Sequence, residues 1–458
     1  MMKQRCATLA ALVLTCSTAA LRADDILDWN ATLRHVAQTN ADHANPGWAT
    51  RAMAMTNGAM YDVLMGFDRT HQPFKHSALA PAGSSQQAAV AQAAYQTLMF
   101  AYPGEQPILD AAIATKLAAI PDGPAKSAGI AYGNQTAQTY IDWRTADNAD
   151  VVVPYTPGTN PGEWRPDPLH PGQSAWGPAW GTLKPFIVNS SDQFPMDPPP
   201  ALDSQEYADA FNQVKELGAL NSATRTADQT DIAIFWAYDR QAMGPPPVLF
   251  NRNLQDVAMT MGNAEPENAR LFAMASVAMA DAATAAWDAK FTANYWRPIT
   301  GIREADTDGN PDTAAEVDWK PLGAPGDDPN DWADDSTPPF PAWPSGHASM
   351  GGALYEVLRD FYGADDVSFV LNSAETMPSG ANTRSFTSFT QAEWENGMSR
   401  VYMGVHWLFD AEDGVKLGND IADWVGANAF QAVPEPGTAG LLMIALVGAP
   451  LSRRRRVQ

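Results

Sequence analysis

Three short stretches in the second half of the chain combine side chains that could bind an anion. The first, "KFTANYWRP", puts Lys290 and Arg297 seven residues apart, close to two turns of a helix. We expect both cations on one helical face, with Pro298 ending or kinking the helix at the arginine. Two such cations are costly unless an anion lies between them, although a solvated basic edge would also explain them.

The second stretch, "PSGH", stands at the start of a predicted helix. A hydroxyl at Ser345 and a backbone N–H at Gly346 would face the end of the helix that favours negative charge. His347 can exchange a proton near neutral pH. The alternative is that Ser345 is only an N-cap and His347 a surface residue.

The third stretch, "SRVYMGVHWLFDAEDG", contains a second arginine and a second histidine. Arg400 and His406 are six residues apart, which we interpret as one helical face across a turn and a half. Asp410 follows His406 by four residues, so its carboxylate can hold the imidazole in one tautomer. An ordinary Asp–His pair on a helix surface is the alternative.

Together these stretches supply what a tetrahedral oxyanion requires: three fixed cations, a hydroxyl, a glycine N–H and two histidines. One histidine could lie in line with the central atom as ligand or nucleophile, while the other handles protons. The chain has seven histidines, and five lack such neighbours. We interpret those five as structural or surface residues: His35, His43, His71, His76 and His170.

The elements that must position these residues are mostly helices. Apolar residues recur at helical spacing, whereas alternating β-branched runs are nearly absent. The predicted fold is all-α, with helical bundles and long irregular loops at 145–203 and 303–344. Helical segments are predicted at 45–67, 84–102, 105–120, 123–144, 204–291, 349–362 and 391–427.

Composition narrows the classes of function. The formal net charge of −23 argues against nucleic-acid binding. Both cysteines, Cys6 and Cys16, lie in the first 23 residues, so the remainder offers no thiol chemistry and no disulfide.

The two ends look like targeting segments. Residues 1–23 have a basic start, a short apolar run and small residues, as a cleaved secretory signal peptide does; a lipoprotein signal at Cys16 is the alternative. Residues 433–458 contain a Pro-Glu-Pro triplet, a short apolar transmembrane stretch and an arginine cluster. This order resembles a PEP-CTERM sorting signal of the kind that exosortase systems process, and a plain tail anchor is the alternative.

Between the ends we predict an N-terminal helical region at 24–203 and a helical region carrying all three stretches at 204–430. Export across the inner membrane would bring the protein to the periplasm, the cell surface or an extracellular matrix.

The pattern K-x6-RP, PSGH and SR-x5-H-x3-D resembles the signature of the type 2 phosphatidic acid phosphatase and vanadium-dependent haloperoxidase superfamily. The segments "KFTANYWRPITGIR" and "TPPFPAWPSGHASMGGA" are similar to the sequences of the haloperoxidase branch. The segment "GEWRPDP" extends the resemblance upstream. We expect it to cover about residues 25–425. It implies a helical fold of the vanadium chloroperoxidase and acid phosphatase kind.

The resemblance also implies roles. Lys290, Arg297, Ser345, Gly346 and Arg400 would hold the oxygens of vanadate. His406 would be the vanadium ligand, His347 the acid–base residue and Asp410 the carboxylate that orients His406. Lys290 would also polarise hydrogen peroxide for attack by halide, giving hypohalous acid. Phe340 matches a position near the metal, where a phenyl ring is similar to the fungal chloroperoxidase type.

Two other functions compete with this interpretation. A phosphatase would use the same residues, with His406 attacking phosphorus, and a matrix protein would use the fold only as a scaffold. The resemblance implies that hydrogen peroxide and halide are partners. It does not decide which small organic molecule is the acceptor or whether the chain forms a homo-oligomer. A further stretch, "DTDGNPDT", alternates Asp306, Asp308, Asn310 and Asp312 as a calcium loop begins, but Pro311 replaces the expected glycine. A polar turn is therefore favoured over calcium.

Overall fold

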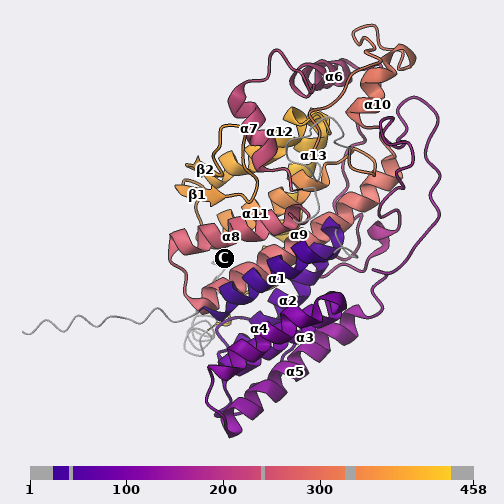
Figure 1. The fold of residues 1–458 in the computed structure, drawn as a ribbon. Coiled ribbons are helices and arrows are strands. Elements are labelled where there is room, and N and C mark those ends of the chain that lie inside the picture. Colours follow the sequence, from indigo (N-terminus) through magenta and orange to yellow (C-terminus); the bar gives the residue numbers. More distant parts are fainter. Residues whose placement is uncertain (1–23, 41–44, 239–242, 325–336, 435–458) are drawn as a thin grey trace, which may run out of the picture.

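The computed structural model describes residues 24–40, 45–238, 243–324 and 337–434. The predicted signal peptide lies outside this part of the chain, as do His43 and all of the predicted sorting segment beyond Pro434. The described ranges are mostly helical, which confirms the all-α prediction (Figure 1). The helices are α1 (Asp25–Thr39), α2 (Pro46–Phe67), α3 (Gln86–Ala101), α4 (Gln106–Ala118), α5 (Pro124–Arg144), α6 (Gln205–Leu217), α7 (Ala227–Phe235), α8 (Pro246–Met261), α9 (Glu265–Ala293), α10 (Pro298–Arg303), α11 (Gly346–Tyr362), α12 (Phe389–Tyr402) and α13 (Leu408–Asn428).

Shorter elements complete the described chain. One antiparallel hairpin pairs β1 (Phe369–Asn372) with β2 (Thr383–Phe386), and three 3-10 turns lie at η1 (Pro103–Glu105), η2 (Trp180–Thr182) and η3 (Ala305–Thr307). The predicted helices α2 to α5 are confirmed, and the irregular stretch 145–203 contains only η2.

The predicted helical segment 204–291 is divided into α6, α7, α8 and α9, and one further predicted helix is wrong. The apolar pattern at 391–427 indicates a single helix, but the chain breaks between α12 and α13. Gly404 has a φ of 78° there, which a glycine adopts without steric cost. The break matters because His406 lies inside it.

The core joins the two halves of the chain along α9. This alanine-rich helix is buried on nearly every side and packs against α2 and α11. At its crossing with α2, the Asn57 amide donates to the Ser276 hydroxyl at 2.9 Å. Farther along, the buried Asp281 carboxylate accepts backbone N–H groups from Phe186, Ile187 and Val188, which fixes the irregular loop to the helix. The predicted boundary near residue 203 stays a prediction.

A second aromatic cluster lies where α6, α10 and the α12–α13 turn meet. Trp407 packs against Tyr207, Phe211 and Phe409. Its indole N–H donates to the carbonyl oxygen of Trp296 at 3.0 Å. The turn that carries His406 is thereby fixed to the segment that carries Arg297.

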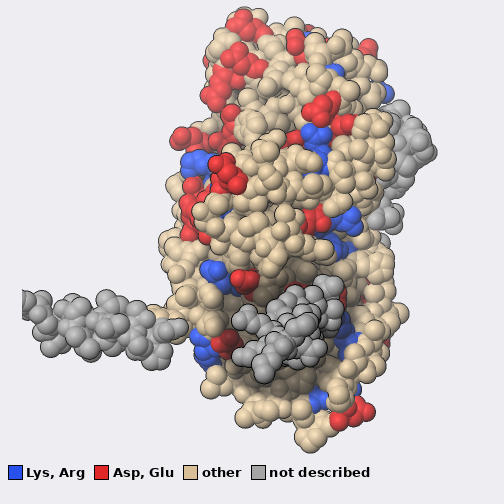
Figure 2. Space-filling view, turned by 90° about the vertical axis from the view of Figure 1, so that its left-hand side faces the viewer, with Lys and Arg blue, Asp and Glu red and all other residues tan. Residues whose placement is uncertain are grey.

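Within the described ranges, no helix has both the length and the apolar run that a membrane span requires. On the face shown in Figure 2, Lys and Arg side chains are scattered among acidic ones, which gather toward the top.

Candidate active site

The structure brings all eight predicted site residues to one buried place. Lys290 comes from the last turn of α9, and Arg297 immediately precedes α10. The PSGH residues form the start of α11, and Arg400 lies in the last turn of α12. His406 stands in the turn before α13, and Asp410 lies in the first turn of that helix. None of the eight lies at the surface.

Two details of local structure differ from the sequence-based prediction. The α9 helix ends at Ala293, with Asn294 in the left-handed conformation, so Lys290 and Arg297 do not share a helical face. Pro298 begins α10 instead of ending α9. Likewise, Arg400 and His406 meet across the break between two helices and not along one.

The irregular segment around Glu163 supports this turn. The backbone N–H of Trp164 donates to the carbonyl oxygen of Asn294 at 2.8 Å. The backbone N–H of Trp296 donates to the carbonyl oxygen of Gly162 at 2.9 Å. The chain can therefore turn sharply between Lys290 and Arg297 with its backbone groups satisfied.

His406 is fixed in one tautomer. Its Nδ1 lies 2.8 Å from Asp410 Oδ2, and its Nε2 lies 3.0 Å from Nη1 of Arg297. A guanidinium can only donate, so Nε2 must be the acceptor and Nδ1 must carry the proton. The Nε2 lone pair therefore points toward the cations.

Burial and the positive charges around His406 all lower the pKa of its imidazole. Burial lowers its pKa well below 6.5, and the charges of Arg297, Lys290 and Arg400 lower it further. The imidazole is therefore neutral near pH 7, as a metal ligand or nucleophile must be.

Asp410 is completely buried. Its Oδ2 also accepts the N–H of Trp407 at 3.0 Å. Burial raises its pKa to about 7, while the charges of Lys290 and Arg297 favour the carboxylate. The backbone carbonyl of Asp410 accepts the N–H of Ser345 at 2.8 Å, which joins the starts of α11 and α13.

Lys290 binds the loop before α11. Its ammonium group donates to the carbonyl oxygens of Pro341, Ala342 and Pro344. Burial lowers the pKa of this lysine well below 10.5, and the charge of Arg297 lowers it further. The sequence contains no signal for these carbonyl partners, because any residue can supply a backbone oxygen.

The Phe340 ring lies against the cations. The Lys290 Nζ is 5.2 Å and the Arg297 guanidinium carbon 4.9 Å from its centroid, within cation–π range. Arg297 also donates to the carbonyl oxygens of Phe340 and Val405, at 2.9 and 2.8 Å.

At the start of α11, the Ser345 hydroxyl accepts the N–H of Ala348 at 3.3 Å. The N-cap alternative for Ser345 is thus correct in geometry, and the hydroxyl proton remains available to a ligand. His347 is buried, so its surface alternative is wrong. Burial, and then the charge of Arg400, lower the pKa of His347 well below 6.5.

The stretch "DTDGNPDT" forms a polar turn. The Asp308 carboxylate accepts the N–H of Asn310 and the hydroxyl of Thr313. The Asn310 amide donates to the carbonyls of Leu202 and Ser204. These contacts fix the start of α6.

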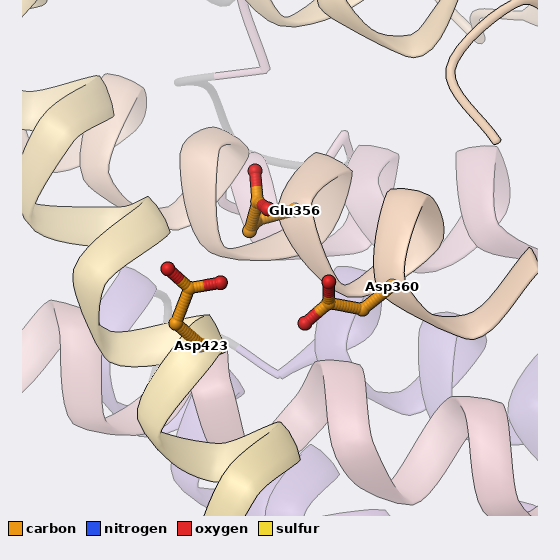
Figure 3. Close-up of side chains that lie close together, drawn as sticks. All are labelled: Glu356, Asp360 and Asp423. Carbon is orange, nitrogen blue, oxygen red and sulfur yellow. The ribbon is translucent and has the colours of Figure 1, made fainter. Parts of the chain in front are cut away.

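A different carboxylate group lies at the surface (Figure 3). Glu356 and Asp360 on α11 and Asp423 on α13 have oxygens within 4.8 Å of one another. Asp360 and Asp423 are exposed, and Arg359 forms an ion pair with Glu356. This is a solvated acidic cluster.

Comparison with known proteins finds similarity to vanadium-dependent peroxidases. Residues 270–434, which contain all eight site residues, match the family model of the VCPO second helical-bundle domain. The vanadium chloroperoxidase of Curvularia inaequalis is 33% identical over 311 residues, which cover 57% of this chain and 49% of that protein. The chain therefore spans about half the length of the curated relative that it matches.

Solved structures extend the likeness to most of the chain. A bacterial vanadium-dependent iodoperoxidase superimposes with a TM-score of 0.76 at 24% identity, covering 90% of this chain and 98% of that one. The chain has the fold of these peroxidases. The holo form of a bacterial vanadium-dependent chloroperoxidase gives a TM-score of 0.65 at 15% identity, covering 85% of this chain and 94% of that one. The fold is thus shared well beyond the segment that matches the family model.

Proposed function

We propose that this chain is a vanadate-dependent haloperoxidase, which uses hydrogen peroxide to oxidise a halide ion to hypohalous acid. The observation that carries the proposal is His406, whose Nε2 lone pair is held toward a buried group of cations. The similarity of residues 270–434 to the VCPO domain, and of the chain to a vanadium chloroperoxidase, supports it.

The residues fit an oxyanion such as vanadate. A neutral imidazole nitrogen suits a transition-metal centre, and guanidinium and ammonium groups suit its anionic oxygens. The ring nitrogens of His347 are both buried, and neither has a hydrogen-bond partner among the described residues. A polar group bound beside them would satisfy this ring.

We assign each residue a role on that basis. His406 Nε2 would bind vanadium, and Lys290, Arg297, Arg400, the Ser345 hydroxyl and the Gly346 N–H would hold the oxygens. Bound vanadate would supply a Lewis acid that activates hydrogen peroxide toward halide.

Two of the roles concern protons. His347 would take up and return a proton, while Asp410 keeps the proton of His406 on Nδ1. Lys290 now donates to three carbonyls, so it would exchange at least one of them to contact the anion.

A paired assay on the purified protein tests the proposal. One arm contains orthovanadate, hydrogen peroxide and bromide, then chloride or iodide, and follows halogenation of a dye. The other arm offers a phosphate monoester without vanadate. We expect vanadate-dependent halogenation that is lost in His406→Ala. Ester hydrolysis without halogenation would make His406 a phosphorylated nucleophile, and activity in neither arm would favour the scaffold.

We also propose that residues 1–23 direct export and that 433–458 act as a PEP-CTERM sorting signal. The order of charged, apolar and Pro-Glu-Pro segments in the sequence supports this. Fractionation of cells expressing the full chain tests it. We expect a processed form outside the inner membrane, and an unprocessed form when Pro434, Glu435 and Pro436 are replaced by alanine.

A further inference from the structure

Asn396 is a buried polar residue next to the site that the assigned roles do not use. It lies on α12, one turn before Arg400, and is completely buried. Its Nδ2 donates to the backbone carbonyl of His347 at 3.3 Å. Its Oδ1 has no partner within the described part of the chain, although a buried amide oxygen normally finds one.

The His347 ring also has nitrogen atoms that lack a well-formed hydrogen bond within the described ranges. Both of its nitrogens are buried and neither forms a hydrogen bond of normal geometry with a described residue, although the Asn396 side chain already raises the pKa of the ring against the lowering by burial. The ring of Phe250 meets it edge to face, with centroids 5.1 Å apart, and provides no polar atom. The amide of Asn396 and the ring of His347 therefore interact in one buried place, and each polar atom there costs free energy unless it forms a full hydrogen bond.

The backbone of α11 makes room for this amide. A Cβ atom added at Gly351, one turn after His347, would lie 2.1 Å from Asn396 Nδ2. A side chain at position 351 would push the amide away, so the close approach of Asn396 to His347 depends on glycine there.

We propose that Asn396 is a positioning residue for His347, with its Oδ1 accepting the Nδ1–H of the imidazole. Nδ1 is the ring nitrogen nearer to the backbone, and the amide is already anchored at the backbone carbonyl of the same residue. The bond fixes the proton on Nδ1 and leaves the lone pair on Nε2, which reaches farther from the backbone. The use of that lone pair to accept a proton rests on the proposed function, but the hydrogen bond itself does not.

The opposing interpretation is that Asn396 only fills space between α11 and α12. The two interpretations differ in the tautomer of His347, which a merely structural residue would not control. The tautomer can be measured without vanadate and without any enzymatic activity. The result of this test is therefore independent of whether the proposed function is correct.

The experiment is nitrogen NMR of the histidine rings in the full-length protein, labelled at histidine and free of vanadate, near pH 7. His347→Gln identifies the His347 signals by their loss. In the wild type we expect a protonated Nδ1 and an unprotonated Nε2. In Asn396→Leu, which keeps the shape of the side chain, we expect these two signals to change character, toward a protonated Nε2 or a mixture.

Asn253→Leu is the matched control. Asn253 is also completely buried, its Oδ1 is also without a partner among the described residues, and its Nδ2 donates to the Tyr355 hydroxyl at 3.4 Å. Tyr355 lies about two turns beyond His347 on α11. We expect this control to leave the His347 signals unchanged.

Gly351→Ala gives a second route to the same result, because it displaces the amide without removing it, and it serves if Asn396→Leu does not fold. A wild-type His347 protonated on Nε2 would overturn the proposal, as would signals unaltered in both Asn396→Leu and Gly351→Ala.

Discussion

Replacing Asp410 by asparagine should weaken His406 as a ligand without changing the histidine itself. The carboxylate accepts both the Nδ1–H of His406 and the N–H of Trp407 on one oxygen. Asparagine has a single acceptor atom. Placed where Oδ2 now lies, that atom can still accept both N–H groups, but a neutral amide is a weaker acceptor than a carboxylate, so the Nδ1–H of His406 is held less firmly and its imidazole is less electron-rich. The Nε2 lone pair, which faces Nη1 of Arg297 at 3.0 Å, then becomes a weaker ligand.

The expected loss is large enough to measure directly. Removing the partner that orients a ligating histidine typically weakens metal affinity by about 10- to 100-fold. This corresponds to about 1.4 to 2.7 kcal/mol of binding free energy. Isothermal titration of the purified variant with orthovanadate provides the dissociation constant, and circular dichroism verifies that the fold is intact.

Asp413→Asn is the control for charge. Asp413 lies on the same helix and accepts the indole N–H of Trp343 at 2.7 Å. The substitution removes one negative charge but leaves His406 with its partner, so we expect an affinity within about threefold of the wild type, since surface and half-buried charges act weakly through solvent. A folded Asp410→Asn that binds vanadate as tightly as the wild type would refute the argument that the carboxylate strengthens His406 as a ligand.

Three other predictions follow from named contacts. Gly346→Ala should destabilise the fold by about 1 to 3 kcal/mol, because its Cβ would lie 2.7 Å from the Trp287 ring; urea denaturation measures this, and an unchanged midpoint would contradict it. Arg297→Lys should weaken vanadate binding at least about tenfold, since a lysine cannot replace the fork that now reaches the Phe340 and Val405 carbonyls and His406; equal affinity by titration would contradict it. Burial raises the pKa of Asp281 from 3.8 to about 6, so between those pH values the folded state binds more protons than the unfolded state and stability falls as pH rises, by about 3 kcal/mol for this group. The difference in unfolding free energy between wild type and Asp281→Asn, measured from pH 3 to pH 8, should show that slope.

The site could be predicted from the sequence as a set of residues but not as a geometry. Side-chain types at fixed spacing identified Lys290, Arg297, Arg400 and His406, because few residue types can neutralise an oxyanion. The spacing argument itself was wrong, since a break between helices separates Lys290 from Arg297, and another separates Arg400 from His406.

What the sequence could not predict is mostly backbone. Carbonyl oxygens hold Lys290, and a left-handed Asn294 ends α9, but neither leaves a mark in the residue pattern. Asn396 was missed for a related reason: one asparagine in a helical stretch carries no signal until its neighbours across α11 are known.

The gathering of cations around His406 also has a consequence for folding. Lys290, Arg297 and Arg400 lower the pKa of His406 together, which means that the folded chain holds like charges close to one another in a buried place. An anion that binds only the folded chain relieves this repulsion and stabilises it, by about 2.7 kcal/mol at a concentration one hundred times its dissociation constant. The melting temperature of this protein should therefore depend on the oxyanion dissolved around it. The chain would then fold most completely where such an ion is present.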